Sequence, residues 1–156
     1  MVVVADTSPI NYLVLIGQIE ILPRLYNRIL IPPAVLGELK HPVAPKPVRD
    51  WVANPPTWLE VLAPKSSFTI AQLDLGESEA IALAMEMHAA LLLIDEQAGR
   101  QEAARRGLKV AGTLSTLDEA DRAGFANFDA AVASLRQTSF RVSEAVLFEI
   151  KKRRSR

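Results

Sequence analysis

The 156-residue sequence contains no cysteine, which excludes disulfide bridges, zinc–thiolate centres and cysteine nucleophiles. It also carries no net charge at neutral pH, so its bulk electrostatics do not indicate a nucleic-acid-binding protein. No stretch is long and apolar enough to span a membrane, and the N-terminus lacks the basic region and long apolar run of a signal peptide. We therefore expect a soluble, cytoplasmic protein with no membrane partner.

The length of the chain fits one domain with its own hydrophobic core, so we expect residues 1–156 to form a single domain. Short apolar runs alternate with helical patterns, which predicts a three-layer α/β/α sandwich with a mainly parallel sheet. The basic segment 151–156 is expected to be a flexible tail. The expected strands are 2–5, 29–31, 58–62, 90–94 and 108–111, and the expected helices are 9–16, 19–26, 34–40, 48–53, 74–87, 96–106, 113–123, 128–137 and 143–152.

The opening apolar run, at 2–5, ends on Asp6, and a helix-start signal follows directly. Ser8 suits the N-cap position and Pro9 suits the first helical position, where its missing N–H costs nothing. Asp6 is therefore expected at the carboxyl end of a buried strand, which is where α/β sheets bind their ligands. Such a carboxylate is either a metal-binding acid or a helix cap.

A second apolar run, at 90–94, ends on Asp95. The carboxyl ends of parallel strands lie at one edge of a sheet, so Asp6 and Asp95 are expected to share that edge. One strand-end aspartate is often only a cap. Two of them on neighbouring strands favour a shared acidic site.

A third acid follows from the helical pattern at 74–87. The residues three, four and seven places after Glu77 are all apolar, so Glu77 is expected on the buried face, whereas Glu79 faces outward. A capping box between Asp74 and Glu77 explains the same residues, so a purely structural role for Glu77 stays open. Glu38 lies at the border of an apolar helical stripe and, taken alone, is most simply a solvated charge.

Several carboxylates gathered at one edge repel one another, so their arrangement is stable mainly when a divalent cation neutralises it. Ligands that are all oxygens select Mg²⁺ or Mn²⁺ over zinc. Such a site activates a water molecule and stabilises the leaving oxygen of a phosphodiester. This chemistry needs no histidine, serine or lysine nucleophile.

Four motifs spread over nearly the whole chain resemble those of PIN-domain nucleases. They are Asp6-Thr7-Ser8-Pro9, then Ile31-Pro32 leading to Glu38-Leu39, then Gly76-Glu77-Ser78-Glu79-Ala80-Ile81, and finally Leu92-Leu93-Ile94-Asp95 followed by Gly99-Arg100. The resemblance implies a parallel α/β/α fold and Mg²⁺- or Mn²⁺-dependent cleavage of single-stranded RNA. It also implies a homodimer. Many members of the family are toxins of toxin–antitoxin pairs, which implies a small antitoxin protein as a partner.

The resemblance further implies a role for particular side chains. Arg100, directly after the fourth motif, is a candidate contact for RNA phosphates, although an ordinary solvated charge explains it as simply. Glu96 offers an extra carboxylate or is an exposed helix charge. Carried over by position, the catalytic, metal-binding acids would be Asp6, Glu38, Glu77 and Asp95, and Thr7 would orient the site through its hydroxyl and contact the substrate.

The sequence departs from the family pattern at two places. Glu77 stands where most PIN proteins have aspartate, and Leu93-Ile94 replaces the threonine that usually precedes the fourth acid. Two other functions therefore stay open. One is a PIN-like module that binds RNA or a partner protein with little or no activity. The other is a phosphotransfer enzyme with Asp6 as nucleophile, resembling haloacid-dehalogenase-like proteins, although Ser8 occupies the place of their second aspartate.

Overall fold

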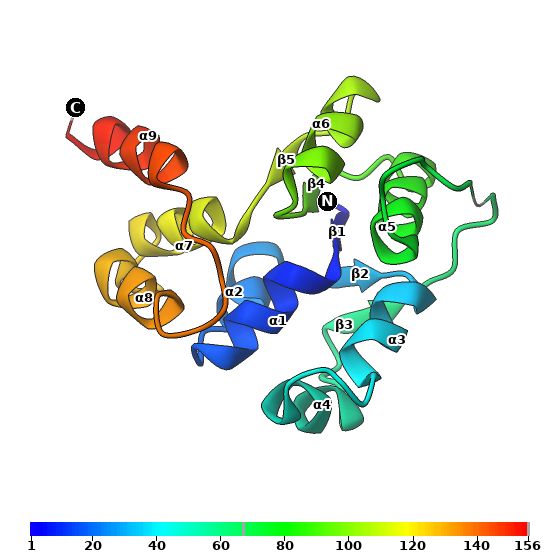
Figure 1. Ribbon diagram of the computed structural model, residues 1–156, viewed down its shortest axis with the longest axis horizontal. Helices are drawn as coiled ribbons and strands as arrows, with labels where there is room; N and C mark the ends of the chain where they lie inside the picture. The colour runs from blue at the N-terminus through cyan, green and yellow to red at the C-terminus, as the bar shows by residue number, and fades with distance from the viewer. Residues whose placement is uncertain (67, 156) are drawn as a thin grey trace.

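The computed structural model describes residues 1–66 and 68–155, and its strands form one all-parallel sheet (Figure 1). The strand order is β3-β2-β1-β4-β5, so the central neighbours β1 and β4 are far apart in the sequence. The predicted parallel α/β architecture is confirmed. The strands are β1 (Val3–Ala5), β2 (Ile29–Ile31), β3 (Leu59–Val61), β4 (Leu91–Leu93) and β5 (Val110–Ala111).

Helices cover both faces of this sheet. Helices α5 (Leu75–Glu86) and α6 (Gln97–Arg105) pack on one face. The helices on the other face are α1 (Thr7–Leu15), α2 (Ile21–Tyr26), α3 (Pro33–Lys40), α4 (Lys46–Ala53), α7 (Thr113–Arg122), α8 (Phe128–Leu135) and α9 (Glu144–Arg154). None of the helices in the described residues has both the length and the hydrophobicity to cross a bilayer.

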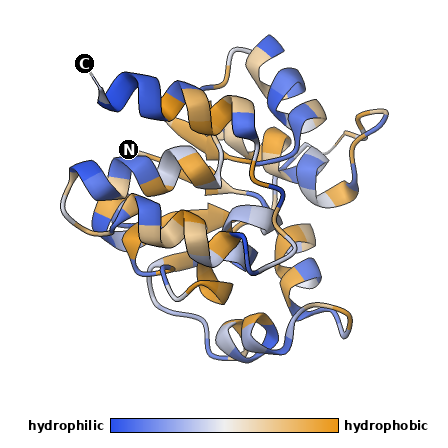
Figure 2. Cartoon of the chain, turned by 60° about the vertical axis from the view of Figure 1, so that its left-hand side comes forward, coloured by the Kyte–Doolittle hydropathy of each residue, from blue (hydrophilic) through white to orange (hydrophobic). Residues whose placement is uncertain are grey.

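The strands build a separate core on each side of the sheet, because successive side chains of a strand point to opposite faces. Val3 and Ala5 of β1 join the larger core, whereas Val4 between them joins the smaller core beneath α5. All three are fully buried, which explains why this run is apolar throughout rather than alternating. Figure 2 shows the hydrophobic strands enclosed by helices that carry their hydrophilic residues on the outside.

The register of the two central strands decides where the candidate acids lie. Ala5 of β1 pairs with Leu93 of β4, and the Asp6 N–H donates to the Leu93 carbonyl at 2.9 Å. Asp6 and Asp95 each follow one of these strands by one or two residues. Both therefore leave the sheet at the same edge, as the sequence predicted.

Helix α1 begins earlier than the sequence predicted. Thr7 is its first residue and Asp6 occupies the N-cap position that was expected for Ser8, which places Pro9 third in the helix. Proline is tolerated there because the N–H groups of the first turn have no partner within the helix. The Asp6 side chain makes no capping hydrogen bond, so it does not serve as the N-cap acceptor of α1.

Helix α9 ends at Arg154, two residues past its predicted end, so the segment 151–156 that was expected to be a flexible tail is helical as far as Arg154. Arg154 Nε donates to Asp118 Oδ1 at 2.7 Å, and its guanidinium pairs with Asp121 at 3.1 Å. Asp118 is buried, and a buried carboxylate requires a charged partner. This tertiary contact orders a segment whose local sequence favours fraying. Arg156 lies outside the described residues.

Candidate active site

A cavity of about 490 Å³ at the carboxyl edge of the sheet is lined by five carboxylates. They come from the end of β1, from α3, and from the starts of α5 and α6. They are Asp6, Glu38, Asp74, Glu77 and Glu96, and we call this space the acid cavity. The structure thus brings together three of the four acids that the sequence singled out, and it adds two others. The fourth, Asp95, lines the adjoining cavity.

Asp6 lies at the buried end of the acid cavity and is 5% exposed. Its Oδ1 atom is buried and has no hydrogen-bond partner among the described residues. Burial raises the pKa of Asp6 well above its ordinary value, and the nearby carboxylates of Asp74, Glu77 and Glu38 raise it further, against the Thr7 backbone N–H. A buried acceptor in this state is stabilised by a proton, a hydrogen-bond donor or a cation.

Glu38 is positioned by contacts with two other helices. The Thr7 hydroxyl donates to Glu38 Oε1 at 2.6 Å. The same oxygen lies so close to α5 that a Cβ atom at Gly76 would approach it to 2.0 Å. Burial raises the pKa of Glu38, although the Thr7 hydrogen bond opposes this. Glu38 is therefore half-buried and faces the acid cavity, which corrects the interpretation of it as a solvated helix charge.

Glu77 forms the predicted capping box and also lines the acid cavity. In a reciprocal capping box, the Glu77 N–H donates to Asp74 Oδ1 at 2.7 Å, and the Asp74 N–H donates to Glu77 Oε1 at 3.1 Å. The other oxygen, Oε2, is buried and has no partner among the described residues. Burial is the main reason that the pKa of Glu77 rises from 4.5 to about 6. A Cβ atom at Gly99 would come within 2.9 Å of Oε2, so this glycine lets α6 approach.

Glu79 faces a different part of the molecule. The Ala34 N–H, in the first turn of α3, donates to Glu79 Oε1 at 3.2 Å. Glu79 satisfies a free N–H at that helix start. Of the two glutamates, Glu77 lines the acid cavity, as the helical pattern predicted.

Asp95 is held by Thr113 at the start of α7. The Thr113 N–H donates to Asp95 Oδ1 and the Thr113 hydroxyl donates to Oδ2, both at 2.7 Å. Burial raises the pKa of Asp95, while Thr113, Ser8 and the positive charge of Arg100 lower it. Each carboxylate oxygen has two lone pairs, so these bonds orient Asp95 and leave it able to accept a further partner.

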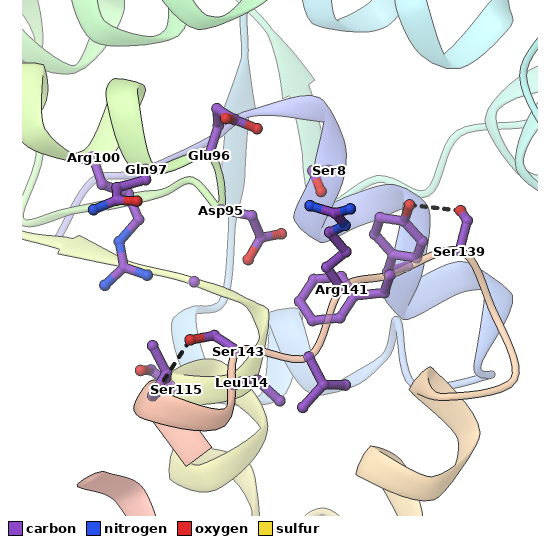
Figure 3. A pocket seen from close by; sticks show the side chains of 15 residues that line it. Ser8, Asp95, Glu96, Gln97, Arg100, Leu114, Ser115, Ser139, Arg141 and Ser143 are labelled. Atoms are coloured by element: carbon purple, nitrogen blue, oxygen red, sulfur yellow. Dashed lines mark hydrogen bonds between the residues drawn. The ribbon is translucent and has the colours of Figure 1, made fainter. Parts of the chain in front are cut away.

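Arg100 stands beside Asp95 in the adjoining cavity, not in the acid cavity (Figure 3). The contact with RNA phosphates that the sequence predicts for Arg100 would therefore lie outside the acid cavity.

Sequence reasoning missed the roles of Thr113, Gly76 and Gly99. The two glycines belong to the quoted motifs, but no local pattern shows which side chain from another element approaches them. Thr113 had a detectable signal, because it follows strand β5 and opens a helix, as Thr7 does after β1. The Thr113 hydroxyl, from a segment distant in the sequence, donates to Asp95. In the family pattern, a threonine directly before this acid carries the hydroxyl.

The acid cavity fits a hard divalent cation in its chemistry. Asp6 Oδ1 and Glu77 Oε2 are buried oxygens that accept no hydrogen bond from the described residues, and oxygen ligands are those that Mg²⁺ and Mn²⁺ prefer. Across residues 1–66 and 68–155, no three acidic, histidine or cysteine side chains stand close enough together to enclose an ion.

A parallel sheet covered by helices, with an acidic cavity at the carboxyl edge of its strands, defines an α/β fold whose candidate site lies where such sheets bind ligands. A family model described as "DUF3368: PIN domain" matches residues 2–156, and the chain belongs to this PIN-domain family. A solved structure of a PilT N-terminus domain protein from the hyperthermophilic archaeon Sulfolobus solfataricus P2 is similar, with a TM-score of 0.53 and 17% identity over 92% of this chain and 100% of that one. At this identity, the likeness shows the fold alone. A comparison with curated proteins finds no match.

The raised pKa of Glu77 predicts that the metal-free protein loses stability as the pH rises. A carboxyl group whose pKa is higher in the folded state takes up a proton on folding, so stability falls between the unfolded value of 4.5 and the folded value of about 6. In EDTA, we expect Glu77→Gln to flatten the decrease in melting temperature between about pH 4.5 and pH 7. Glutamine can still accept the hydrogen bond of the capping box, so the melting curves of the variant isolate the effect of ionising Glu77. Equal pH dependence in the two proteins would contradict the assignment.

Proposed function

We propose that this protein is a metal-dependent endoribonuclease that hydrolyses phosphodiester bonds of single-stranded RNA with Mg²⁺ or Mn²⁺ in the acid cavity. The observation that carries the proposal is the pair of buried oxygens without donors, Asp6 Oδ1 and Glu77 Oε2, among three further carboxylates. Buried acceptors in a cluster of like charge are unfavourable unless a cation binds there. Membership of the PIN-domain family supports the same chemistry.

The surroundings of each residue suggest its role in binding the metal or in positioning a metal ligand. A bound Mg²⁺ or Mn²⁺ would supply a nucleophilic water at neutral pH and stabilise the charge on the leaving oxygen. Asp6 and Glu77 would hold the cation, and Thr7 would keep Glu38 turned toward it. Asp95, oriented by Thr113, would bind from the adjoining side. The exposed Glu96 stands at the mouth shared by both cavities.

Removal of the metal tests the proposal directly. We expect EDTA to abolish cleavage of a single-stranded RNA and added Mn²⁺ or Mg²⁺ to restore it, whereas Ca²⁺ restores little because its coordination is larger and more flexible. Gel analysis of labelled RNA measures the products. Cleavage that persists in EDTA would refute a metal-dependent mechanism. Binding of RNA with Mn²⁺ but without cleavage would instead support an inactive, RNA-binding PIN module.

The homodimer, the antitoxin partner and the cytoplasmic toxin role stay predictions from the family resemblance. The molecular mass in solution, measured by sedimentation, tests the first of them. A monomer at micromolar concentration would contradict it.

A further inference from the structure

The adjoining cavity, of about 620 Å³, differs from the acid cavity in its chemistry. It brings together the start of α1, the start of α6, the start of α7 and the 139–143 segment that leads into α9 (Figure 3). Two arginines, Arg100 and Arg141, face it, and serine hydroxyls surround them. The serines are Ser8, Ser115, Ser139 and Ser143. Guanidinium groups and hydroxyls are the donors that proteins use for phosphate oxygens.

The two arginines lack strong partners. Within the described residues, neither guanidinium forms an ion pair or a hydrogen bond with another side chain or with the backbone, although Arg105, Arg106, Arg122 and Arg154 all pair with acids. The positive charge of Arg100 acts on Asp95, whose oxygens both accept from Thr113. The cavity therefore offers cationic donors that the fold does not use.

The segment that carries Arg141 is fixed against α1. The hydroxyls of Tyr12 and Ser139 share a hydrogen bond at 2.8 Å, and the Tyr12 and Phe140 rings pack edge to face with centroids 5.0 Å apart. Arg141 follows directly, and in Figure 3 its side chain extends toward Ser8, beside Asp95. The backbone at Arg141 is therefore held in place by the packing of the preceding residues on α1.

The two cavities lie side by side, because Ser8, Tyr12 and Glu96 line both of them. We propose that the second cavity is a phosphate-binding subsite, in which Arg100 and Arg141 hold a backbone phosphate of single-stranded RNA next to the one at the acid cavity. The inference rests on the proposed function for the identity of its ligand. It explains how a chain without net charge holds a polyanion close to a cluster of carboxylates: the positive contacts are local and adjacent.

Binding measured without cleavage tests this subsite. Fluorescence anisotropy of a labelled oligouridylate in EDTA, at a series of salt concentrations, gives the affinity and its salt dependence. We expect Arg141→Gln to weaken binding about tenfold and to reduce the slope of log affinity against log salt by about 0.7, the value for one phosphate contact on a single strand. Arg141→Lys should keep most of the slope, because it keeps the charge.

The matched control is Arg28→Gln. Arg28 pairs with Glu60 at 3.2 Å and directly precedes β2, at the opposite, amino edge of the sheet, so the same loss of charge there should leave both quantities unchanged. A strand of abasic sugar-phosphate should lose affinity for Arg141→Gln by the same factor, since the phosphate is the ligand. Equal affinity and slope for Arg141→Gln and Arg28→Gln would overturn the subsite. An Arg141-dependent affinity without metal-dependent cleavage would uphold the subsite and refute only the proposed enzyme.

Discussion

Replacement of Asp6 by asparagine is expected to abolish RNA cleavage and also to make the metal-free protein more stable. Asp6 Oδ1 is buried and finds no donor in the described part of the chain, and burial together with three neighbouring carboxylates opposes the ionisation of Asp6. A neutral amide of the same shape removes that repulsion, and its NH₂ group can donate to the surrounding acids. Replacing a residue that serves stability alone should not make the protein more stable. Replacing a carboxylate that is held ready for a metal ion should, as long as the metal is absent.

Two measurements separate these effects. Cleavage by Asp6→Asn in Mn²⁺ should fall at least about a hundredfold, because even partners that merely orient a metal ligand contribute 10- to 100-fold. In EDTA the melting temperature should rise by a few degrees, and the increase that Mn²⁺ gives the unmodified protein should disappear.

Asp50→Asn is a suitable control for Asp6→Asn. Asp50 is exposed on α4 and pairs with Lys46, so its loss should change neither activity nor the Mn²⁺ effect. Retention of a full Mn²⁺-dependent increase in melting temperature by Asp6→Asn would remove Asp6 from the proposed metal site.

Alanine at Gly76 is expected to lower the activity of the protein strongly without unfolding it. The added Cβ atom would stand 2.0 Å from Glu38 Oε1, which is the end of a flexible side chain and can be displaced. Displacement breaks the hydrogen bond from Thr7 and turns Glu38 out of the acid cavity. Alanine is a better helix former than glycine by roughly 1 kcal/mol, which offsets part of the loss in stability. We expect cleavage to fall by at least about tenfold.

Gly37→Ala provides a closely matched comparison. Gly37 lies next to Glu38 in α3, but a Cβ atom there meets nothing within 4 Å. This variant should keep its activity and gain about 1 kcal/mol of stability, which corresponds to a melting temperature about 2–4 °C higher for a chain of this size. The contrast between the two alanines reports the Glu38 contact rather than a general response of helices to alanine.

A double-mutant cycle completes the test of Gly76. In a Glu38→Ala background the clash is absent, so Gly76→Ala should stabilise the protein by about as much as Gly37→Ala does. If Gly76→Ala cleaves RNA at the normal rate, Glu38 is not required in the position that the structure shows.

The strands and the edge of the sheet were predictable because their signals are local. A run that is apolar at every position indicates a strand buried on both faces, and Val3, Val4 and Ala5 are fully buried. The residue that ends such a run must stand at the sheet edge. Asp6 and Asp95 could therefore be placed at one edge, and the helical period alone distinguished Glu77 from Glu79.

The partners of these acids were not predictable, because they come from segments that are distant in the sequence. Thr7 and Glu38 are 31 residues apart, and Asp95 and Thr113 are 18 apart. Nothing in the local pattern of α3 distinguishes Glu38 from a solvated charge. Its burial depends on how closely α5 packs, and that depends on Gly76.

The order of the C-terminal segment follows the same principle. The local composition of 151–154 predicts fraying, but the buried carboxylate of Asp118 on α7 binds Arg154 and keeps α9 helical. Short-range periodicity dictates which segments become strands or helices and which acids end at the ligand-binding edge. Only the packing of one helix on another determines which oxygens are left buried without a donor, because that outcome depends on distances between residues far apart along the chain.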